Sequence, residues 1–420
     1  MLLNTGPVAT LASGDINSPL TGTDMSNTES LILDGDIGIL IEGDIISKIS
    51  ASEELADEFG TEDNSTLRVI DCQGKAIIPG FVDSHTHLLW GGDRANEMQL
   101  RHNGMTYSDI ANSGGGIQKT VKYTRNISND SLGELGLKRI TRALELGTTT
   151  MECKSGYGLS VDSELKLLEV NQLLSELTPM GLHSTWLGAH DVPKEITMED
   201  YVDELIHIQL PAVVDQGFAS YADVFCEPGW FSLEDTELIV KAASELGLAS
   251  RLHVDEFVDG GGLALASELG AISADHVGHS SDSARQSASE SGVMQTFLPG
   301  TPYILGHDLE SPLKQCIDNN WAFSLASDFN PNCRTLSIPF VGSLATHRLG
   351  LSPIEALVAV TRNPATTLIN STVGPLSGSI RQGGPADLLI LDSEYIDAWC
   401  QMPGDNPIYK TIKSGAFVNR

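Results

Sequence analysis

The feature of the sequence that most constrains the fold is a series of eight short apolar runs, rich in β-branched residues, that alternate with helical patterns. Runs of this length bounded by turn residues predict β-strands, and strands alternating with helices predict a parallel sheet. Eight such strands close into a barrel, so we predict an α/β fold built on a (β/α)8 TIM-type barrel. The runs are IIPGFVDSHTH, TTTMECK, HSTWLGAH, ADVFCE, SRLHVDE, SADHVGH, VMQTFLP and AFSLASD.

Helical signals lie between these runs. Residues 163–177 repeat leucine at helical spacing, which predicts a helix with one apolar face. Two further helices are predicted to begin at Ser232 and Ser352, because each serine can cap a helix and is followed three residues later by an acidic residue. The leucines expected to share one face of the first helix are Leu165, Leu168, Leu173 and Leu177.

The two ends of the chain differ from the middle. LILDGDIGILIEGDIISKIS holds two apolar runs that turn at Gly43-Asp44, and DLLILD with YKTIKSGAFVN forms a second strand pair around Ser414-Gly415. Both patterns are typical of hairpins rather than of strand–helix units. We predict that residues 1–78 and 371–420 build one small, discontinuous β-sandwich domain beside a barrel of residues 79–370.

Charge and composition exclude several classes of function. Acidic residues outnumber basic ones 56 to 25, giving a net charge of −31, which disfavours nucleic acid and anionic membranes as partners. No apolar stretch approaches the roughly 18 residues of a membrane span, and the first twenty residues lack the pattern of a secretory signal. We therefore expect a cytoplasmic protein, and we expect its six scattered cysteines to be reduced. The acidic surplus is also compatible with a surface adapted to high salt.

Candidate metal ligands lie where barrel strands end, which is where side chains from different strands meet. His85 and His87 are two residues apart, so an extended chain directs both imidazoles to the same side. His253 ends the fifth run and Asp328 ends the eighth. An isolated histidine pair can simply hydrogen-bond in a loop, but four potential ligands at three strand ends favour Zn²⁺ or iron with an activated water.

The run PGFVDSHTH, with the later histidine and aspartate, resembles the amidohydrolase superfamily. GGDRANEMQLRHNGMTYSDIANSGGGIQKTVKYTR narrows this to a resemblance to the imidazolonepropionase family. The likeness covers about residues 75–370, continuing in order through KSGYGLSVDSELKLL, TWLGAHDVP, DVFCEPGWFS, HVDEF, SADHVGH and SDFNPN.

The resemblance implies hydrolysis of 4-imidazolone-5-propanoate to N-formimidoyl-L-glutamate in histidine degradation, by a homodimer. It places the metal ligands on the four residues chosen above, His85, His87, His253 and Asp328. Binuclear members of the superfamily commonly carry a bridging lysine on the fourth strand, and ADVFCE has none. We therefore expect one Zn²⁺ or Fe²⁺/Fe³⁺ ion per subunit.

The resemblance also implies substrate contacts at Arg94, Tyr157, His190, Glu256 and Asn330. Arg94 offers a planar donor fork for the propanoate, and Tyr157 lies in a glycine-flanked loop that can close over the ring. His190 is expected to donate to the oxyanion. Glu256 is expected to bind the ring nitrogens and to relay a proton to the departing nitrogen.

Two further residues complete the predicted catalytic group. His276, at the end of the sixth run, is expected to orient the attacking water or polarise the carbonyl. Asp328 is expected to accept the water proton besides binding the metal. The catalytic residues are thus Asp328, Glu256, His276 and His190.

The chain departs from the family pattern after the aspartate ligand. Many members have Asn-Pro-Gly and then a small hydroxyl residue, whereas this chain has Asn330-Pro331-Asn332-Cys333. We expect Asn332 to contact the substrate through its backbone and Cys333 through its weakly donating thiol. Glu256 also stands where some relatives carry glutamine.

Two other classes of function compete with this interpretation. The first is another cyclic-amide hydrolase or deaminase of the superfamily, because the same metal site serves these reactions. The second is a barrel that binds metal without catalysis. Arg94, Tyr157 and Glu256 favour an anionic, nitrogen-bearing ring over a neutral purine or pyrimidine.

Overall fold

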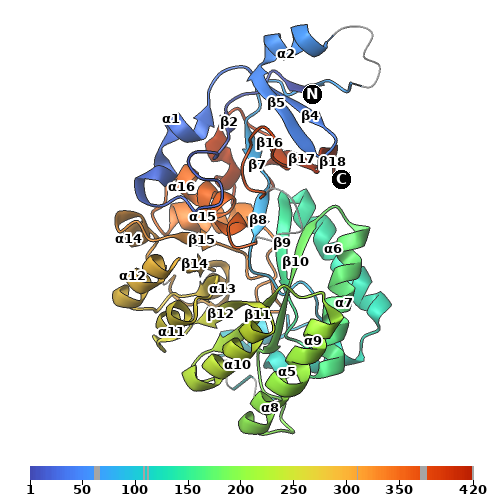
Figure 1. The fold of residues 1–420 in the computed structure, drawn as a ribbon, viewed down its shortest axis with the longest axis vertical. Coiled ribbons are helices and arrows are strands. Elements are labelled where there is room, and N and C mark those ends of the chain that lie inside the picture. The colour runs from blue at the N-terminus through green and yellow to red at the C-terminus, as the bar shows by residue number, and fades with distance from the viewer. Residues whose placement is uncertain (61–66, 107–108, 111–112, 310, 369–375, 419–420) are drawn as a thin grey trace.

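The computed structural model describes residues 1–60, 67–106, 109–110, 113–309, 311–368 and 376–418. Its centre is an eight-stranded parallel sheet of order β15-β14-β13-β12-β11-β10-β9-β8, surrounded by helices (Figure 1). Each predicted run supplies one strand of this sheet, so the barrel prediction is confirmed. The strands are β8 (Phe81–Asp83), β9 (Thr148–Lys154), β10 (Gly181–Ala189), β11 (Tyr221–Cys226), β12 (Ala249–Val254), β13 (Ser273–His276), β14 (Met294–Phe297) and β15 (Phe323–Leu325).

The first and last strands of the barrel meet just beyond their carboxyl ends. Thr86 and Phe329 form a parallel bridge there. The amide of His87 donates to the Phe329 carbonyl at 2.8 Å, and the amide of Asp328 donates to the His85 carbonyl at 3.1 Å. The backbone that closes the barrel therefore also carries three of the predicted metal ligands, which fixes them beside one another.

The first predicted run is not one strand but two. Its first half, β7 (Ile77–Pro79), pairs antiparallel with β16 (Leu388–Leu391) outside the barrel, and only its second half enters the barrel as β8. Gly80 separates them, and a Cβ at this position would lie 2.2 Å from the hydroxyl oxygen of Thr149. Glycine is therefore required at the point where the chain passes from one sheet to the other.

Strands from both ends of the chain form two further sheets, of order β18-β17-β16-β7-β2-β3 and β5-β4-β1-β6. These sheets lie at one end of the molecule, where both termini are also found (Figure 1). Apolar side chains from the two sheets, including Leu2, Ile39, Ile77 and Leu388, share one core. The strands not yet given are β1 (Leu2–Leu3), β2 (Val8–Ala9), β3 (Ile32–Leu33), β4 (Ile37–Glu42), β5 (Ile45–Ala51), β6 (Ile70–Asp71), β17 (Ile408–Lys413) and β18 (Ala416–Phe417).

Both predicted hairpins are present in these terminal sheets. β4 and β5 turn at Gly43-Asp44, and β17 and β18 turn at Ser414-Gly415. The division of the chain into residues 1–78 with 371–420 and residues 79–370 stays a prediction, and its second boundary lies outside the described residues.

The helices confirm the predicted caps. Ser232 with Asp235, and Ser352 with Glu355, form complete capping boxes at the starts of α10 and α16. None of the helices within the described ranges is long and apolar enough to cross a membrane. The helices are η1 (Gly22–Ser26), α1 (Thr28–Leu31), α2 (Ser52–Phe59), α3 (Glu97–His102), α5 (Gly116–Asn126), α6 (Asn129–Glu145), α7 (Val161–Leu177), α8 (Met198–Glu204), the π-helix η2 (Leu205–Gln209), α9 (Leu210–Gln216), α10 (Leu233–Glu245), α11 (Gly262–Leu269), α12 (Asp282–Ser291), α13 (Gly300–Leu305), α14 (Leu313–Asp318), α15 (Ile338–His347), α16 (Pro353–Ala359), α17 (Arg362–Ala365) and η3 (Ile396–Cys400).

The leucine face predicted for α7 is wrong. Leu173 and Leu177 are exposed, whereas Leu168 is buried. The buried stripe includes the polar residues Glu164 and Asn171. Because these two polar side chains interrupt the apolar pattern, the leucine spacing alone pointed to the wrong side of the helix.

Candidate metal centre and active site

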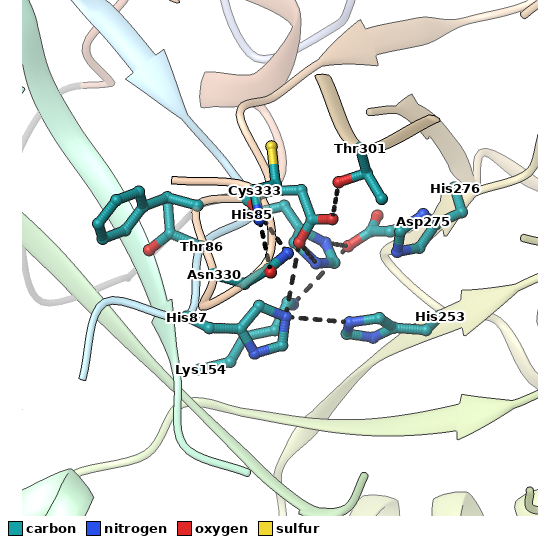
Figure 2. Close-up of polar contacts among 12 residues, drawn as sticks. His85, Thr86, His87, Lys154, His253, Asp275, His276, Thr301, Asn330 and Cys333 are labelled. Atoms are coloured by element: carbon teal, nitrogen blue, oxygen red, sulfur yellow. Dashed lines mark hydrogen bonds and ion pairs between the residues drawn. The ribbon is translucent and has the colours of Figure 1, made fainter. Parts of the chain in front are cut away.

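The four predicted ligands converge at the carboxyl end of the barrel, where Figure 2 labels the three histidines. The Nε2 atoms of His87 and His253 are 3.4 Å apart. Asp328 Oδ1 lies 3.6 Å from His85 Nε2 and 3.7 Å from His87 Nε2. Ligand atoms about 2.1 Å from a tetrahedral Zn²⁺ are about 3.4 Å apart, so this spacing suits a single ion.

The atoms that face one another in this group are buried and lack other partners. Within the described part of the chain, His85 Nε2 and Asp328 Oδ1 have no hydrogen-bond partner. An unsatisfied buried polar atom costs about 1–3 kcal/mol, and a cation between these atoms would remove that cost. The donor set therefore fits a metal ion. His85 and Asp328 also form a second, overlapping group with His276.

Carboxylates fix the protonation of two of the imidazoles. His85 Nδ1 donates to Asp275 Oδ2 at 2.7 Å, and His253 Nδ1 donates to Asp223 Oδ1 at 3.0 Å. Because a carboxylate can only accept, the proton sits on Nδ1 and the Nε2 lone pair faces the ligand group. Burial holds the pKa of His85 well below its usual value, which keeps the ring neutral.

The backbone is strained at two residues of the site. Asp328 has φ 50° and His276 has φ 75°, both in the left-handed region that non-glycine residues rarely adopt. Each such residue costs about 1–3 kcal/mol and needs a rigid surrounding structure. For Asp328 that support includes Thr301, whose hydroxyl donates to the Oδ2 atom and leaves Oδ1 turned to the histidines.

A cavity above the ligand group brings ten of the twelve predicted site residues together. His85 and Cys333 are the two that do not line it. The predicted residues that line it are His87, Arg94, Tyr157, His190, His253, Glu256, His276, Asp328, Asn330 and Asn332.

The predicted side-chain contact of Cys333 with substrate needs correction. Its thiol is buried and faces the backbone carbonyl of Ser327 at 3.6 Å, away from the cavity. Burial raises the pKa of this thiol to about 12. Cys333 thus packs beneath the loop rather than presenting a donor to a ligand.

The side chain of Asn330 shapes the loop that follows β15. Its Nδ2 donates to the Asp328 carbonyl at 2.8 Å. Its Oδ1 accepts from the backbone amides of Asn332 at 2.7 Å and Cys333 at 3.0 Å. These bonds hold the loop beside the ligand aspartate, a role the sequence did not indicate.

Arg94 is positioned by an acidic neighbour that the sequence analysis missed. Its Nε and Nη2 atoms lie 2.9 Å and 2.8 Å from Glu97 Oε2, and both side chains are buried. Glu97 Oε1 in turn accepts from the amide of Gly116 at 3.0 Å. Glu97 therefore fixes the plane of the guanidinium at the cavity wall. The three-residue spacing between Arg94 and Glu97, the first residue of α3, was the available signal.

A second missed acid positions the loop of Tyr157. The carboxylate of Glu164 accepts from the amides of Gly156, Gly158 and Leu159 at 2.7–2.8 Å. Three charge-assisted bonds to consecutive parts of one loop hold its shape. Glu164 lies in the first turn of α7, where an acidic residue is ordinary, so nothing in the sequence distinguished it.

The tautomer of His190 alters its predicted role. Its Nδ1 donates to the Gly156 carbonyl at 2.9 Å, and burial lowers its pKa to about 3. A neutral ring with its proton on Nδ1 has an acceptor at Nε2. His190 is therefore suited to accept an N–H group, and the expected donation to an oxyanion does not fit this geometry.

Glu256 and His276 face one another across the cavity. Glu256 Oε2 lies 3.8 Å from His276 Nε2. Burial, together with the charges of Asp328 and Glu227, raises the pKa of Glu256 well above its usual value. The raised pKa favours the protonated form of this carboxyl group, which suits it to act as an acid.

Comparison of the sequence with known proteins identifies the family of this chain. Residues 68–124 match a family model described as "Amidohydrolase family". The imidazolonepropionase of Symbiobacterium thermophilum is 40% identical over 423 residues, covering 100% of this chain and 96% of the relative. The chain belongs to the imidazolonepropionase family. The imidazolonepropionase of Clostridium tetani is 38% identical over 94% of this chain and 93% of that protein.

Solved structures share the fold of this imidazolonepropionase family member at low sequence identity. They include Aspergillus niger ochratoxinase, with a TM-score of 0.66 and 18% identity over 99% of this chain and 94% of that one. A mutant of atrazine chlorohydrolase TrzN from Arthrobacter aurescens TC1, complexed with zinc and atraton, has a TM-score of 0.70 and 15% identity. The match covers 99% of this chain and 95% of that one. The chain is a hydrolase of the amidohydrolase superfamily, with a histidine cluster able to bind metal.

Proposed function

We propose that this enzyme hydrolyses 4-imidazolone-5-propanoate to N-formimidoyl-L-glutamate. The observation that supports this substrate is a buried arginine, Arg94, on the wall of the same cavity as the His and Asp cluster. Water adds to the ring carbonyl, the ring C–N bond breaks, and the departing nitrogen takes a proton. The products of that ring opening are a carboxylate and the formimidoyl group.

We assign one Zn²⁺ or iron ion to His85, His87, His253 and Asp328. Imidazole and carboxylate donors favour these metals over Ca²⁺ or Mg²⁺. When bound, such an ion supplies Lewis acidity that lowers the pKa of a water molecule toward about 7 and polarises the carbonyl. The chain supplies the remaining chemistry.

Asp328 and Glu256 have opposite duties in this mechanism. Asp328 Oδ1, which faces the histidines, accepts the proton of the attacking water. Glu256, whose raised pKa favours its protonated form, delivers a proton to the departing nitrogen. His276, 3.8 Å from Glu256, orients the reacting carbonyl.

Recognition of the substrate falls to other residues that line the same cavity. Arg94, held in plane by Glu97, binds the propanoate through parallel N–H groups. His190 accepts a ring N–H at Nε2, and Tyr157 covers the ring from its anchored loop. Assembly as a homodimer and a cytoplasmic location stay predictions.

The decisive experiment follows the loss of imidazolonepropionate absorbance with protein of known metal content and detects formimidoylglutamate as product. We expect turnover that disappears on chelation and returns with Zn²⁺ or Fe²⁺. Folded, fully metallated protein without turnover would overturn the substrate and direct attention to other cyclic amides or to deamination.

A further inference from the structure

Lys154, the last residue of β9, lies in the barrel interior below the ligand group, and none of the roles above uses it (Figure 2). Its side chain is completely buried with three carboxylates around it. Its Nζ lies 2.9 Å from Glu152 Oε1, 2.7 Å from Asp223 Oδ2 and 3.7 Å from Asp275 Oδ2. Two of these acids, Asp223 and Asp275, accept the hydrogen bonds from His253 and His85.

The barrel architecture explains this arrangement. Lys154, Asp223 and Asp275 come from the second, fourth and sixth strands of the barrel, whereas His85 and His253 belong to the first and fifth. Side chains in such a barrel stack in layers drawn from alternate strands, and these layers are usually branched and apolar. Here a charged layer from the even strands supports the histidines supplied by the odd strands.

The ammonium group of Lys154 lies against both aspartates, 2.7 Å from Asp223 Oδ2 and 3.7 Å from Asp275 Oδ2. A carboxylate fixed in this way specifies the orientation of the imidazole that donates to it. Desolvation alone would lower the pKa of Lys154, but Asp223, Glu152 and Asp275 raise it above the usual value, so the amine stays charged.

We propose that Lys154 is a positioning residue that sets the metal affinity of the enzyme through Asp223 and Asp275. One ammonium group holds both carboxylates, and these hold the rings of His253 and His85 with the Nε2 lone pairs directed at the ion. The inference rests on the ligand set proposed above. His87 differs, because its Nδ1 has no hydrogen-bond partner among the described residues, so two of the three imidazoles depend on Lys154.

The test removes the charge while keeping the length of the side chain, with Lys154→Met. The dissociation constant for Zn²⁺ is measured by competition with a chromogenic chelator, and the Co²⁺-substituted protein gives an absorption spectrum that reports ligand geometry. Loss of outer partners of metal-bound histidine typically weakens binding 10–100-fold, and we expect a change of that size. Lys154→Arg keeps the charge and should bind more tightly than Lys154→Met.

A matched control separates this role from general stability. Lys413 is also a buried lysine, 2.7 Å from Asp387 Oδ2, but it lies in the terminal sheets. Lys413→Met should lower the melting temperature and leave the Zn²⁺ dissociation constant and the Co²⁺ spectrum unchanged. If Lys154→Met does not fold, Lys154→Gln is measured in its place.

The outcomes distinguish the inference from the proposed site. Wild-type affinity and an unchanged Co²⁺ spectrum in the Lys154 variants would overturn the positioning role while leaving the ligand set intact. A wild-type protein that binds no ion tightly, or a His87→Ala variant that binds it as well as wild type does, would overturn the ligand set itself.

Discussion

Individual residues in the cavity owe their chemical roles to the partners around them. Asp223 is a buried acid with Lys154 and His253 within ion-pair distance, whereas Glu256 is a partly buried acid without either partner. Glu256 instead faces further negative charge, from Asp328 and Glu227. Opposite pKa shifts of this kind suit one acid to donate a proton and keep the other ionised.

The pH dependence of turnover tests the role of Glu256. Its pKa is raised, so the carboxyl group loses its proton only as pH rises through that elevated value, and kcat should fall in the same range. Glu256→Gln should remove this alkaline decrease and lower kcat by about 10²–10⁴-fold. The metal content of the variant serves as the control. A variant that keeps the alkaline decrease would assign the titration to another group.

Arg94 offers a separate test of substrate recognition. Arg94→Ala removes a hydrogen-bonding charge worth about 1.5–3 kcal/mol, so kcat/KM should fall roughly 10- to 150-fold, mainly through KM. Bound metal, measured by elemental analysis, should not change. His87→Ala provides the contrasting variant, in which metal and activity disappear together. Unchanged kinetics for Arg94→Ala would contradict the propanoate assignment.

The sequence predicted the residues that face the cavity better than the residues that support them. His85, His87, His253 and Asp328 stand at strand ends, where barrel geometry alone brings side chains together. Lys154 also ends a strand, but its contacts with acids on β11 and β13 depend on how deep each side chain lies. The spacing of residues in the sequence does not predict how deep a side chain lies in the barrel. The charged layer could therefore be identified only from the structure.

At the scale of secondary-structure elements, the loops around the cavity are held by acids at the starts of helices. Glu164 in α7 binds the Tyr157 loop, and Glu97 in α3 binds both Arg94 and the start of α5. The same use of Glu164 explains why the α7 leucine face was predicted wrongly. A helix whose buried stripe includes functional polar residues does not show the uninterrupted apolar pattern from which a face is inferred.

Removing the loop anchor should affect binding without affecting the metal. Glu164→Gln keeps the size of the side chain but replaces one acceptor oxygen and the negative charge, so the three loop amides lose part of their support. We expect the unfolding free energy to fall by about 1–3 kcal/mol and KM to rise, with metal content unchanged. Glu169, exposed on the same helix and bonded only to Asn129 among the described contacts, gives the control variant Glu169→Gln. Equal KM values in both variants would contradict the anchoring role.

For the whole molecule, the dominant physical property is the net charge of −31. Repulsion among surface carboxylates destabilises a compact state, and salt screens it, with a Debye length that shortens from about 10 Å at 0.1 M to about 3 Å at 1 M. A strongly acidic surface therefore makes stability depend on ionic strength.

Thermal unfolding in NaCl and in KCl measures this dependence. We expect the melting temperature to rise by several degrees between 0.1 M and 1 M of either salt, because screening acts on the folded state more than on the expanded chain. Sulfate is avoided, since it stabilises proteins by exclusion from their surface. A melting temperature that stays constant across this range would rule out a salt-adapted surface.

The terminal sheets impose an order on biosynthesis. β7 is made early, but its antiparallel partner β16 begins about 310 residues later, and at 5–20 residues per second the ribosome needs roughly 15–60 s to reach it. During that interval the edge of β7 that pairs with β16 has no partner strand. The barrel strands emerge in between and can pair as they appear, so the first segment synthesised is among the last to reach its final environment.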